Sequence, residues 1–321
     1  MVMLPGYPFS VINFLLYTFF YLLFSIPLTL SYRTTRVINF AHANFITYGI
    51  YTAVFLNGIL GNSSLFIATI SAFLVAGIMA VANHVFVFKP LEKRGASMNL
   101  IMIASMGLWI MYNYVLYMIA DIAHAMIGMN FISYGRITYK DVPELVVNGV
   151  SLSPTFTAGL LYTSAILLGL YLFLEKTILG KAVRAVSDNP LLSEISGIPR
   201  DNIVLLTWFI CGGIAGLGGA LWTSFSGTVT PTSGDAMILQ VFTVSFIGGL
   251  VSLLRTGIGA VAIAFIENIG IAYLNSLFNV PTSFRPFLTF LTLLTILIVS
   301  PPLGAAGGLP YRFRSKKVKE K

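Results

Sequence analysis

Long apolar segments that carry almost no charge limit the folds that are open to this chain. A helix needs about 20 mostly apolar residues to cross a bilayer. Nine segments come close to that length, at about 10–31, 40–60, 65–88, 98–120, 155–175, 203–225, 237–254, 257–278 and 286–300. They lack the alternation of polar and apolar residues that is typical of a transmembrane β-barrel. We therefore predict an all-α, polytopic bundle of transmembrane helices with about nine spans.

The composition agrees with a lipid-facing exterior. Only 9% of the residues are charged and 57% are hydrophobic, whereas roughly a quarter of a soluble domain is charged. We expect the whole chain, 1–321, to form a single transmembrane domain. The apolar segment at the N-terminus lacks a basic flank and a cleavage pattern, which favours a first span over a signal peptide. The seventh segment contains Gly248 and Gly249 and the ninth is short, so either could be re-entrant or broken, and eight to ten spans stay open.

The distribution of basic residues predicts the orientation in the membrane. With nine spans and the N-terminus outside, sixteen of the 19 basic residues lie inside, as the positive-inside rule requires. The sixteen are Arg33, Arg36, Lys89, Lys93, Arg94, Lys176, Lys181, Arg184, Arg200, Arg255, Arg312, Arg314, Lys316, Lys317, Lys319 and Lys321. Arg136, Lys140 and Arg285 lie outside. We predict a multi-pass protein of the cell membrane with a basic cytoplasmic tail at about 303–321, whose charge needs no nucleic-acid partner.

Several chemistries are missing from the sequence. It contains no G-x-x-x-x-G-K-[ST] phosphate loop, no G-x-S-x-G or H-E-x-x-H motif and a single cysteine, Cys211, so we expect no enzyme, cofactor or metal site in this chain. Glu267 is the one acid well inside a predicted span, whereas carriers driven by protons or sodium usually need several such groups. A transport pathway without its own energy source is favoured. A self-sufficient secondary transporter or channel is the alternative, and a membrane-embedded enzyme is disfavoured by the missing motifs.

A charged loop at about 176–202 interrupts the apolar sequence and is predicted to be cytoplasmic. Within it, Asn189 is suited to an N-cap, Pro190 to the first helical position, and Gly197 to the position after the helix. The apolar residues Leu191, Leu192, Ile195 and Ile198 share one face. A helix of about seven residues is marginal in water by itself. It must dock, either on the ends of its own bundle or in a groove of a cytoplasmic partner.

Three blocks of the sequence resemble the permeases of the branched-chain amino acid ABC importer family. The first, "LGKAVRAVSDNPLLSEISGIPRDN", is similar to the cytoplasmic coupling loop of that family. The matching positions are Gly180, Ala182, Arg184, Ala185, Asp188, Gly197 and Ile198.

The second and third blocks follow in the family's order. "VINFAHANF" is similar to the block I-N-F-A-H-G, with Asn39, Phe40, Ala41 and His42 as matches and with departures at Ala43 and Asn44, where a glycine and an acid are usual. "FIGGLVSLLRTGIGAVAIAFIE" is similar to a glycine-rich block that ends in an acid. Its matches are Gly248, Gly249, Ser252, Gly259 and Glu267, and its departures are Val251 and Ala264.

The resemblance implies a permease subunit that forms the translocation pathway for branched-chain or related amino acids. Such a subunit works with a second permease (homologous or identical), two ATP-binding cassette subunits that hold ATP-Mg, and an extracytoplasmic solute-binding protein. The residues expected to couple the permease to the ATPase are Asp188, Leu191, Leu192, Ile195, Gly197 and Ile198. The departures leave the identity of the solute open.

Polar and small residues within the spans complete the prediction. Asn39, His42 and Glu267 are predicted to line the pathway; a buried polar pair is the alternative for the first two, and a hydrogen bond to a neighbouring helix is the alternative for Glu267. The glycines Gly212, Gly216, Gly219, Gly248 and Gly249 are predicted to let helices pack closely.

Overall fold

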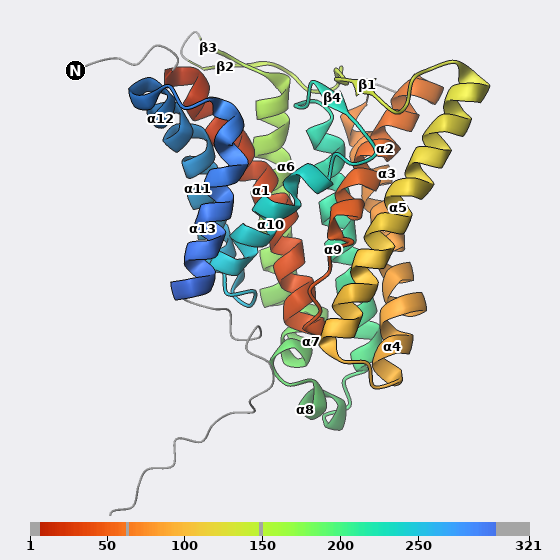
Figure 1. Ribbon diagram of the computed structural model, residues 1–321. Helices are drawn as coiled ribbons and strands as arrows, with labels where there is room; N and C mark the ends of the chain where they lie inside the picture. Colours follow the sequence, from red (N-terminus) through yellow and green to blue (C-terminus); the bar gives the residue numbers. More distant parts are fainter. Residues whose placement is uncertain (1–6, 62–63, 148–149, 300–321) are drawn as a thin grey trace, which may run out of the picture.

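The structure is a computed structural model that describes residues 7–61, 64–147 and 150–299. The predicted tail at 303–321 and the end of the ninth predicted span lie outside the described residues. Helices run roughly alongside one another and form one bundle, and only short strands are added at one end (Figure 1).

The first half of the chain supplies five long helical stretches and three short strands. In chain order its elements are α1 (Tyr7–Thr35), α2 (His42–Leu60), α3 (Leu65–Asn83), the π-helical η1 (His84–Phe88), α4 (Lys89–Lys93), α5 (Met98–Ile127), β1 (Tyr134–Gly135), β2 (Leu145–Val147), β3 (Val150–Leu152) and α6 (Pro154–Lys176). Strands β2 and β3 form an antiparallel hairpin, whereas β1 pairs with β4 from the second half of the chain.

The second half begins with two short helices and returns to long ones. Its elements are α7 (Ile178–Asp188), α8 (Pro190–Ile195), α9 (Arg200–Trp222), β4 (Thr228–Val229), α10 (Asp235–Ile247), α11 (Leu253–Phe265), the π-helical η2 (Ile266–Gly270), α12 (Ile271–Phe278), the 3-10 turn η3 (Thr282–Phe284) and α13 (Arg285–Val299).

Eight helical stretches in the described part of the chain are long and apolar enough to cross a membrane, within the predicted range of eight to ten. For the seventh segment, 237–254, the structure has the interrupted form that was left open, because α10 has only 13 residues. At 1.5 Å per residue that is about 20 Å, against a hydrocarbon thickness of about 30 Å. The helix ends because Gly249 and Leu250 have φ angles of 64° and 60°, which an α-helix cannot contain.

Between α9 and α10 the chain is mostly irregular, and it becomes helical again only at α10. After α9 it turns at β4, runs without regular structure toward α10, and continues as α10, which packs against α1, α11 and α13 (Figure 1). Helix α1 begins at the strand-bearing end of the bundle. Helix α13 runs toward the opposite end, where α7 and α8 lie (Figure 1).

Helix α9 lies at the centre and packs through glycines. A Cβ atom added to Gly212 would lie 2.4 Å from the Cβ of Ala80, and one added to Gly216 would lie 2.3 Å from the Cβ of Ala76, both on α3. At Gly219 it would lie 2.2 Å from the backbone oxygen of Ile46 on α2. The two helices can approach α9 this closely only because the side chains are absent.

Gly248 and Gly249 have a different part in the structure. They form the turn that follows α10, where a Cβ on Gly248 would lie 2.2 Å from Oγ1 of Thr256 and Gly249 adopts the left-handed conformation. The close contact at Gly248 is made with the first turns of α11 rather than along two packed helices.

Replacing Gly216 by valine is expected to destabilise the bundle. Forcing extra atoms into a packed contact costs at least about 1–3 kcal/mol, and the neighbours here are backbone and Cβ atoms that cannot rotate away. The melting temperature in mild detergent, followed by size-exclusion chromatography, should fall clearly. Gly169→Val on α6 is the matched control, since nothing lies within 4 Å of the added Cβ; equal melting temperatures for the two variants would contradict the packing account.

Candidate functional site

The loop at 176–202 folds into α7 and α8 at the end of the bundle opposite the strands (Figure 1). Oδ1 of Asn189 accepts a hydrogen bond from the amide of Leu192 at 3.0 Å, and Pro190 opens α8. Gly197 follows α8 with a φ of 81°. The predicted N-cap, first residue and terminating glycine are therefore confirmed, in a helix of six residues.

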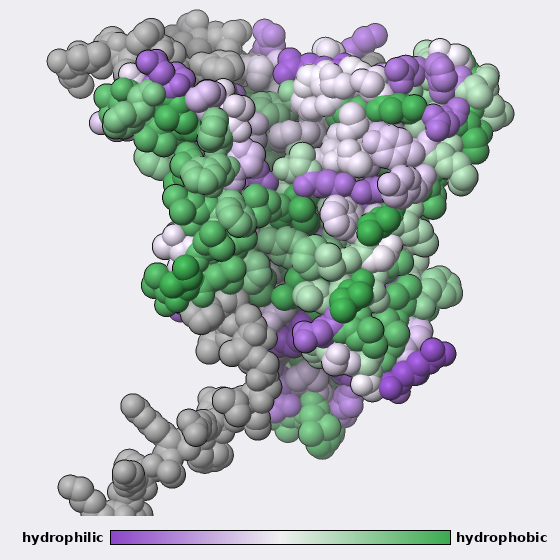
Figure 2. All heavy atoms as spheres, viewed as in Figure 1, coloured by the Kyte–Doolittle hydropathy of each residue, from purple (hydrophilic) through white to green (hydrophobic). Residues whose placement is uncertain are grey.

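The apolar side chains of α8 point away from the protein. Leu191, Leu192 and Ile195 are 70%, 58% and 75% exposed, although they are large and apolar. Only Ile198, just after the helix, packs against the core. Figure 2 shows the resulting hydrophobic tip beyond the bundle. The alternative in which this face folds back onto the chain's own helix ends is wrong for these three residues.

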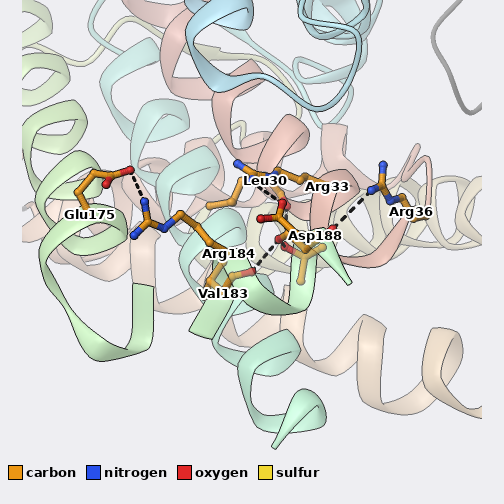
Figure 3. A network of polar contacts seen from close by, with 9 residues as sticks. Leu30, Arg33, Arg36, Glu175, Val183, Arg184 and Asp188 are labelled. Atoms are coloured by element: carbon orange, nitrogen blue, oxygen red, sulfur yellow. Dashed lines mark hydrogen bonds and ion pairs between the residues drawn. The ribbon is translucent and has the colours of Figure 1, made fainter. Parts of the chain in front are cut away.

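Ion pairs and hydrogen bonds join α7 to the ends of two long helices (Figure 3). Arg33 at the end of α1 pairs with Asp188 at 3.0 Å, and Arg184 of α7 pairs with Glu175 of α6 at 2.6 Å. Nη2 of Arg36 also donates to the backbone oxygen of Ser187 at 3.4 Å. Exposed ion pairs of this kind contribute little stability, about 0–1 kcal/mol each, but they fix which helices α7 contacts.

A second set of ion pairs joins the start of α9 to α4. Arg200 contacts Glu92 at 2.7 Å and lies 3.8 Å from Glu194 of α8, while Lys89 pairs with Asp201 at 2.7 Å. Helix α7 is thus tied to α1 and α6, while Arg200 at the start of α9 contacts both α8 and α4. A displacement of α8 can reach α4 through Arg200 and can reach α1 and α6 through the adjoining α7.

The predicted pathway residues Asn39 and His42 are completely buried. Nε2 of His42 lies 2.9 Å from the backbone oxygen of Phe24 on α1, which is the structural contact that the alternative reading expected. Neither amide atom of Asn39 has a hydrogen-bond partner within the described chain. A pathway role for these two residues stays a prediction.

Sequence reasoning missed Asp235, the first residue of α10. Its Oδ1 accepts from Nε1 of Trp109 at 2.6 Å and its Oδ2 from Nδ2 of Asn113 at 2.7 Å, both in the middle of α5. Asn44 of α2 donates in turn to Oδ1 of Asn113 at 2.7 Å. Asp235 lies two residues before the predicted span, so it was not counted as an intramembrane acid. The available signal was a short, Gly-interrupted apolar segment, which often marks a binding site in transporters.

The polar contacts of Asp235 matter because α5 packs on the bundle along a narrow strip. Six residues of this 30-residue helix are buried: Ile101, Ser105, Leu108, Asn113, Leu116 and Ala120. Two of them are polar, and Tyr48 of α2 adds a hydrogen bond of 3.2 Å to the backbone oxygen of Tyr112. Hydrogen bonds therefore carry much of the attachment of α5.

Glu267 lies in the π-helical turn η2 beside a cavity of about 520 Å³. The hydroxyls of Tyr21 and Thr289 each donate a hydrogen bond to its carboxylate. The same cavity is lined by Gln240 and Arg285, and the guanidinium of Arg285 lies 5.8 Å from the ring centre of Tyr17. A π-helical turn frequently marks a functional position, and here it points an acid at a polar cavity.

A segment at 131–141 crosses the strand-bearing end of the bundle and connects it to the cavity wall. β1 pairs with β4, and the amide of Ile137 donates to the backbone oxygen of Thr223 at 3.1 Å. Asp141 accepts from the amides of Leu65 and Phe66 at 2.8 and 3.1 Å. Partial burial raises the pKa of Asp141, but these hydrogen bonds and one from Ser64 outweigh burial, so its pKa is lowered overall.

The geometry defines a class of protein: a multi-pass membrane protein with a polar cavity toward one end and a short helix with an exposed apolar face at the other. A family described as branched-chain amino acid transport system / permease component matches residues 10–299. The chain belongs to this family and is a permease subunit of the cell membrane.

Individual relatives agree with the family. A probable branched-chain amino acid transport permease protein LivH of Methanocaldococcus jannaschii is 31% identical over 83% of this chain and 81% of its own length. The high-affinity branched-chain amino acid transport system permease proteins LivH of Salmonella typhimurium and BraD of Pseudomonas aeruginosa are 24% and 25% identical over 88% and 78% of this chain, and over 89% and 81% of their own lengths. No solved structure gives a significant match.

Asp235→Asn is expected to loosen α5. The asparagine would turn one of its amide protons toward Trp109 or Asn113, which are both donors, and leaving a buried donor unsatisfied costs about 1–3 kcal/mol. Amides of α5 should exchange hydrogen faster and the fluorescence of Trp109 should shift to the red, with Trp208 and Trp222 replaced by phenylalanine. Asp121→Asn is the matched control, because Asp121 is exposed on the same helix. Unchanged exchange in α5 would contradict the role given to Asp235.

Proposed function

We propose that this chain is a permease subunit of an ATP-binding cassette importer that carries branched-chain or related amino acids. It would act with two ATP-binding subunits that hold ATP-Mg, a second permease and an extracytoplasmic solute-binding protein. The observation that carries the proposal is the exposed apolar face of α8, at the end of the bundle remote from the cavity. The named functions of the relatives support the choice of solute.

The apolar face of α8 is suited to a groove on an ATP-binding subunit. A short helix that leaves Leu191, Leu192 and Ile195 in water loses the burial that would stabilise it. A partner groove would supply that burial, in the manner of other helix-in-groove contacts. Closure of the ATP-binding subunits would then move α8, and the ion pairs at Asp188 and Arg200 would carry the movement to α1 and α4.

A second permease is proposed to cover the face on which α10 crosses α1. Figure 2 shows hydrophilic side chains in the upper half of this face, above a more apolar surface. The irregular segment that leads to α10 contributes the partly exposed Thr232 and Ser233, and the first residue of α10 is the partly exposed Asp235. Irregular backbone at membrane depth is tolerated only where protein buries it or where it lines a water-filled cavity. The pathway would therefore lie on this face, between the two permeases.

Glu267 is proposed as a pathway residue. Asn39 and His42 are proposed to stabilise the packing of the helices that surround the pathway. Both of the latter are buried between helices, and Glu267 lines the cavity. Asp188, Leu191, Leu192, Ile195 and Gly197 are proposed for coupling, with Ile198 as the anchor of α8 on the bundle.

The rival function is a secondary transporter or channel that works without partners. Reconstitution separates the two. The purified chain in proteoliposomes should take up no leucine, and uptake should appear only with the ATP-binding subunits, the second permease, a solute-binding protein and ATP. Rapid uptake by the chain alone would favour the rival.

Ile195→Asp is expected to uncouple the permease from its ATPase. An unpaired charge placed against an apolar groove costs more than the roughly 1–3 kcal/mol of an uncompensated polar group. Solute-stimulated ATP hydrolysis and uptake should both fall at least tenfold, and the ATP-binding subunits should co-purify poorly. Membrane insertion should be normal, since the change lies outside the spans. Gly197→Val should act in the same direction through the strained φ of 81°.

Two control variants belong with this test. Ile195→Leu keeps the apolar contact, and Lys181→Gln removes an exposed charge from α7; both should transport normally. Normal assembly and uptake with Ile195→Asp would mean that α8 is not the coupling element.

Orientation can be tested by cysteine labelling on a background in which the buried Cys211 is replaced by alanine. Ser196, next to α8, and Ser133, near the strands, are both exposed. A reagent that cannot cross the membrane should label Ser133→Cys but not Ser196→Cys in intact cells, and both in broken cells. The reverse pattern would show that α7 and α8 lie outside.

A further inference from the structure

The cavity beside Glu267 is lined by side chains of opposite charge that do not pair with one another. Glu267 comes from η2 and Arg285 from the start of α13. No described carboxylate lies within 4.0 Å of Arg285. Glu267 lies within a predicted span and is only 2% exposed, where an unpaired charge is expensive. The cavity therefore holds a cation and an anion, each with capacity for a further partner.

Two polar atoms among the lining residues have no hydrogen-bond partner within the described chain. One is a donor, Nε of Arg285, and the other is an acceptor, Oε1 of Gln240. Gln240 is only 8% exposed, so water outside the protein does not satisfy it. Buried polar groups are nearly always hydrogen-bonded. A ligand that satisfies both residues must offer an acceptor at one end and a donor at the other.

Glu267 can join Gln240 in binding a cationic donor. Its carboxylate already accepts hydrogen bonds from the hydroxyls of Tyr21 and Thr289, but a carboxylate has about four lone-pair sites. The side chain of Gln240 also hydrogen-bonds to this carboxylate, so about one of these sites stays open for an ammonium group. Arg285 presents a planar fork of donors that matches a carboxylate.

The remaining walls are aromatic and apolar. Tyr17, Trp222, Met237 and Pro286 line the same cavity. Its volume of about 520 Å³ falls within the range of roughly 300–1,000 Å³ that is common for small-molecule sites. An apolar side chain could be accommodated between the two charged ends.

We propose that this cavity binds a zwitterionic α-amino acid, with Arg285 on its carboxylate and Gln240 and Glu267 on its ammonium group. Arg285 and Gln240 then determine specificity, because each reads one charge of the solute. The site rests on the proposed transport of amino acids and deepens it. A lipid headgroup could offer Arg285 the same kind of anion, so the experiment has to separate the two sources.

The test measures binding to the permease complex without the solute-binding protein. Permeases and ATP-binding subunits are placed in phosphatidylcholine nanodiscs, and radiolabelled L-leucine is competed with leucinamide, which lacks the carboxylate, and with 4-methylpentanoate, which lacks the amine. The unaltered complex should bind leucine at least roughly tenfold more tightly than either analogue, because each analogue leaves one charged partner unsatisfied.

The variants should change selectivity and not only affinity. Arg285→Gln should weaken the binding of leucine roughly tenfold or more and abolish the preference for leucine over leucinamide. Arg285→Lys should keep that preference. Gln240→Leu should reduce the preference over 4-methylpentanoate. Lys140→Gln, which removes an exposed cation at the same end of the bundle, should change nothing. Equal weakening of all three ligands would indicate damaged packing and would overturn the assignment.

Three further outcomes are decisive. If Arg285→Gln abolishes the binding of phosphatidylglycerol from the nanodisc but leaves leucine binding unchanged, the anion at Arg285 is a headgroup and the proposal is overturned. If the complete importer takes up no leucine with ATP, the proposed function fails. If uptake proceeds and the variants bind all three ligands like the unaltered complex, only the zwitterion site fails.

Discussion

The lack of water in the hydrocarbon core of a bilayer is the constraint on which the rest of this structure depends. Most of the chain satisfies its backbone groups within long helices. One exception is the irregular segment before α10, which ends at Asp235, the first residue of α10, where hydrogen bonds reach the middle of α5. Such a segment persists only beside protein or trapped water. That requirement is the reason for proposing that the transport pathway and a second permease share this face of the molecule.

The two ends of the bundle are built for different tasks. At one end α8 lies between α7, which forms ion pairs with α1 and α6, and the start of α9, which forms ion pairs with α4. At the other, β1 and β4 tie the segment at 131–141 to the wall of the cavity. Between them α9 forms a rigid spine, since its glycines allow contact distances that leave no room for sliding. A rigid centre with polar attachments at both ends favours rearrangement around α9 rather than within it.

The sequence predicts the helices well and the cavity poorly, for a physical reason. Apolar segments and helix-capping residues act locally, so the spans and the N-cap of α8 at Asn189 can be predicted directly from them. The seventh predicted span ends early because Gly249 and Leu250 both have positive φ angles. Of these two residues, only the glycine is recognisable in the sequence as a residue that can end a helix. Asp235, Gln240 and Arg285 acquire their significance from partners far along the chain. No spacing within a single segment could reveal those contacts.

The narrow attachment of α5 has a consequence for the way in which the protein can move. Apolar contact weakens gradually as two surfaces slide, because its strength follows area. Hydrogen bonds such as those of Asp235 with Trp109 and Asn113 are directional and are lost over a few tenths of an ångström. Where α5 is held by such bonds, it has a bound and a released position with little between them. Helix α5 is accordingly suited to behave as a switch with discrete states. The geometry of a few amide and carboxylate groups sets the displacement at which α5 changes from one state to the other.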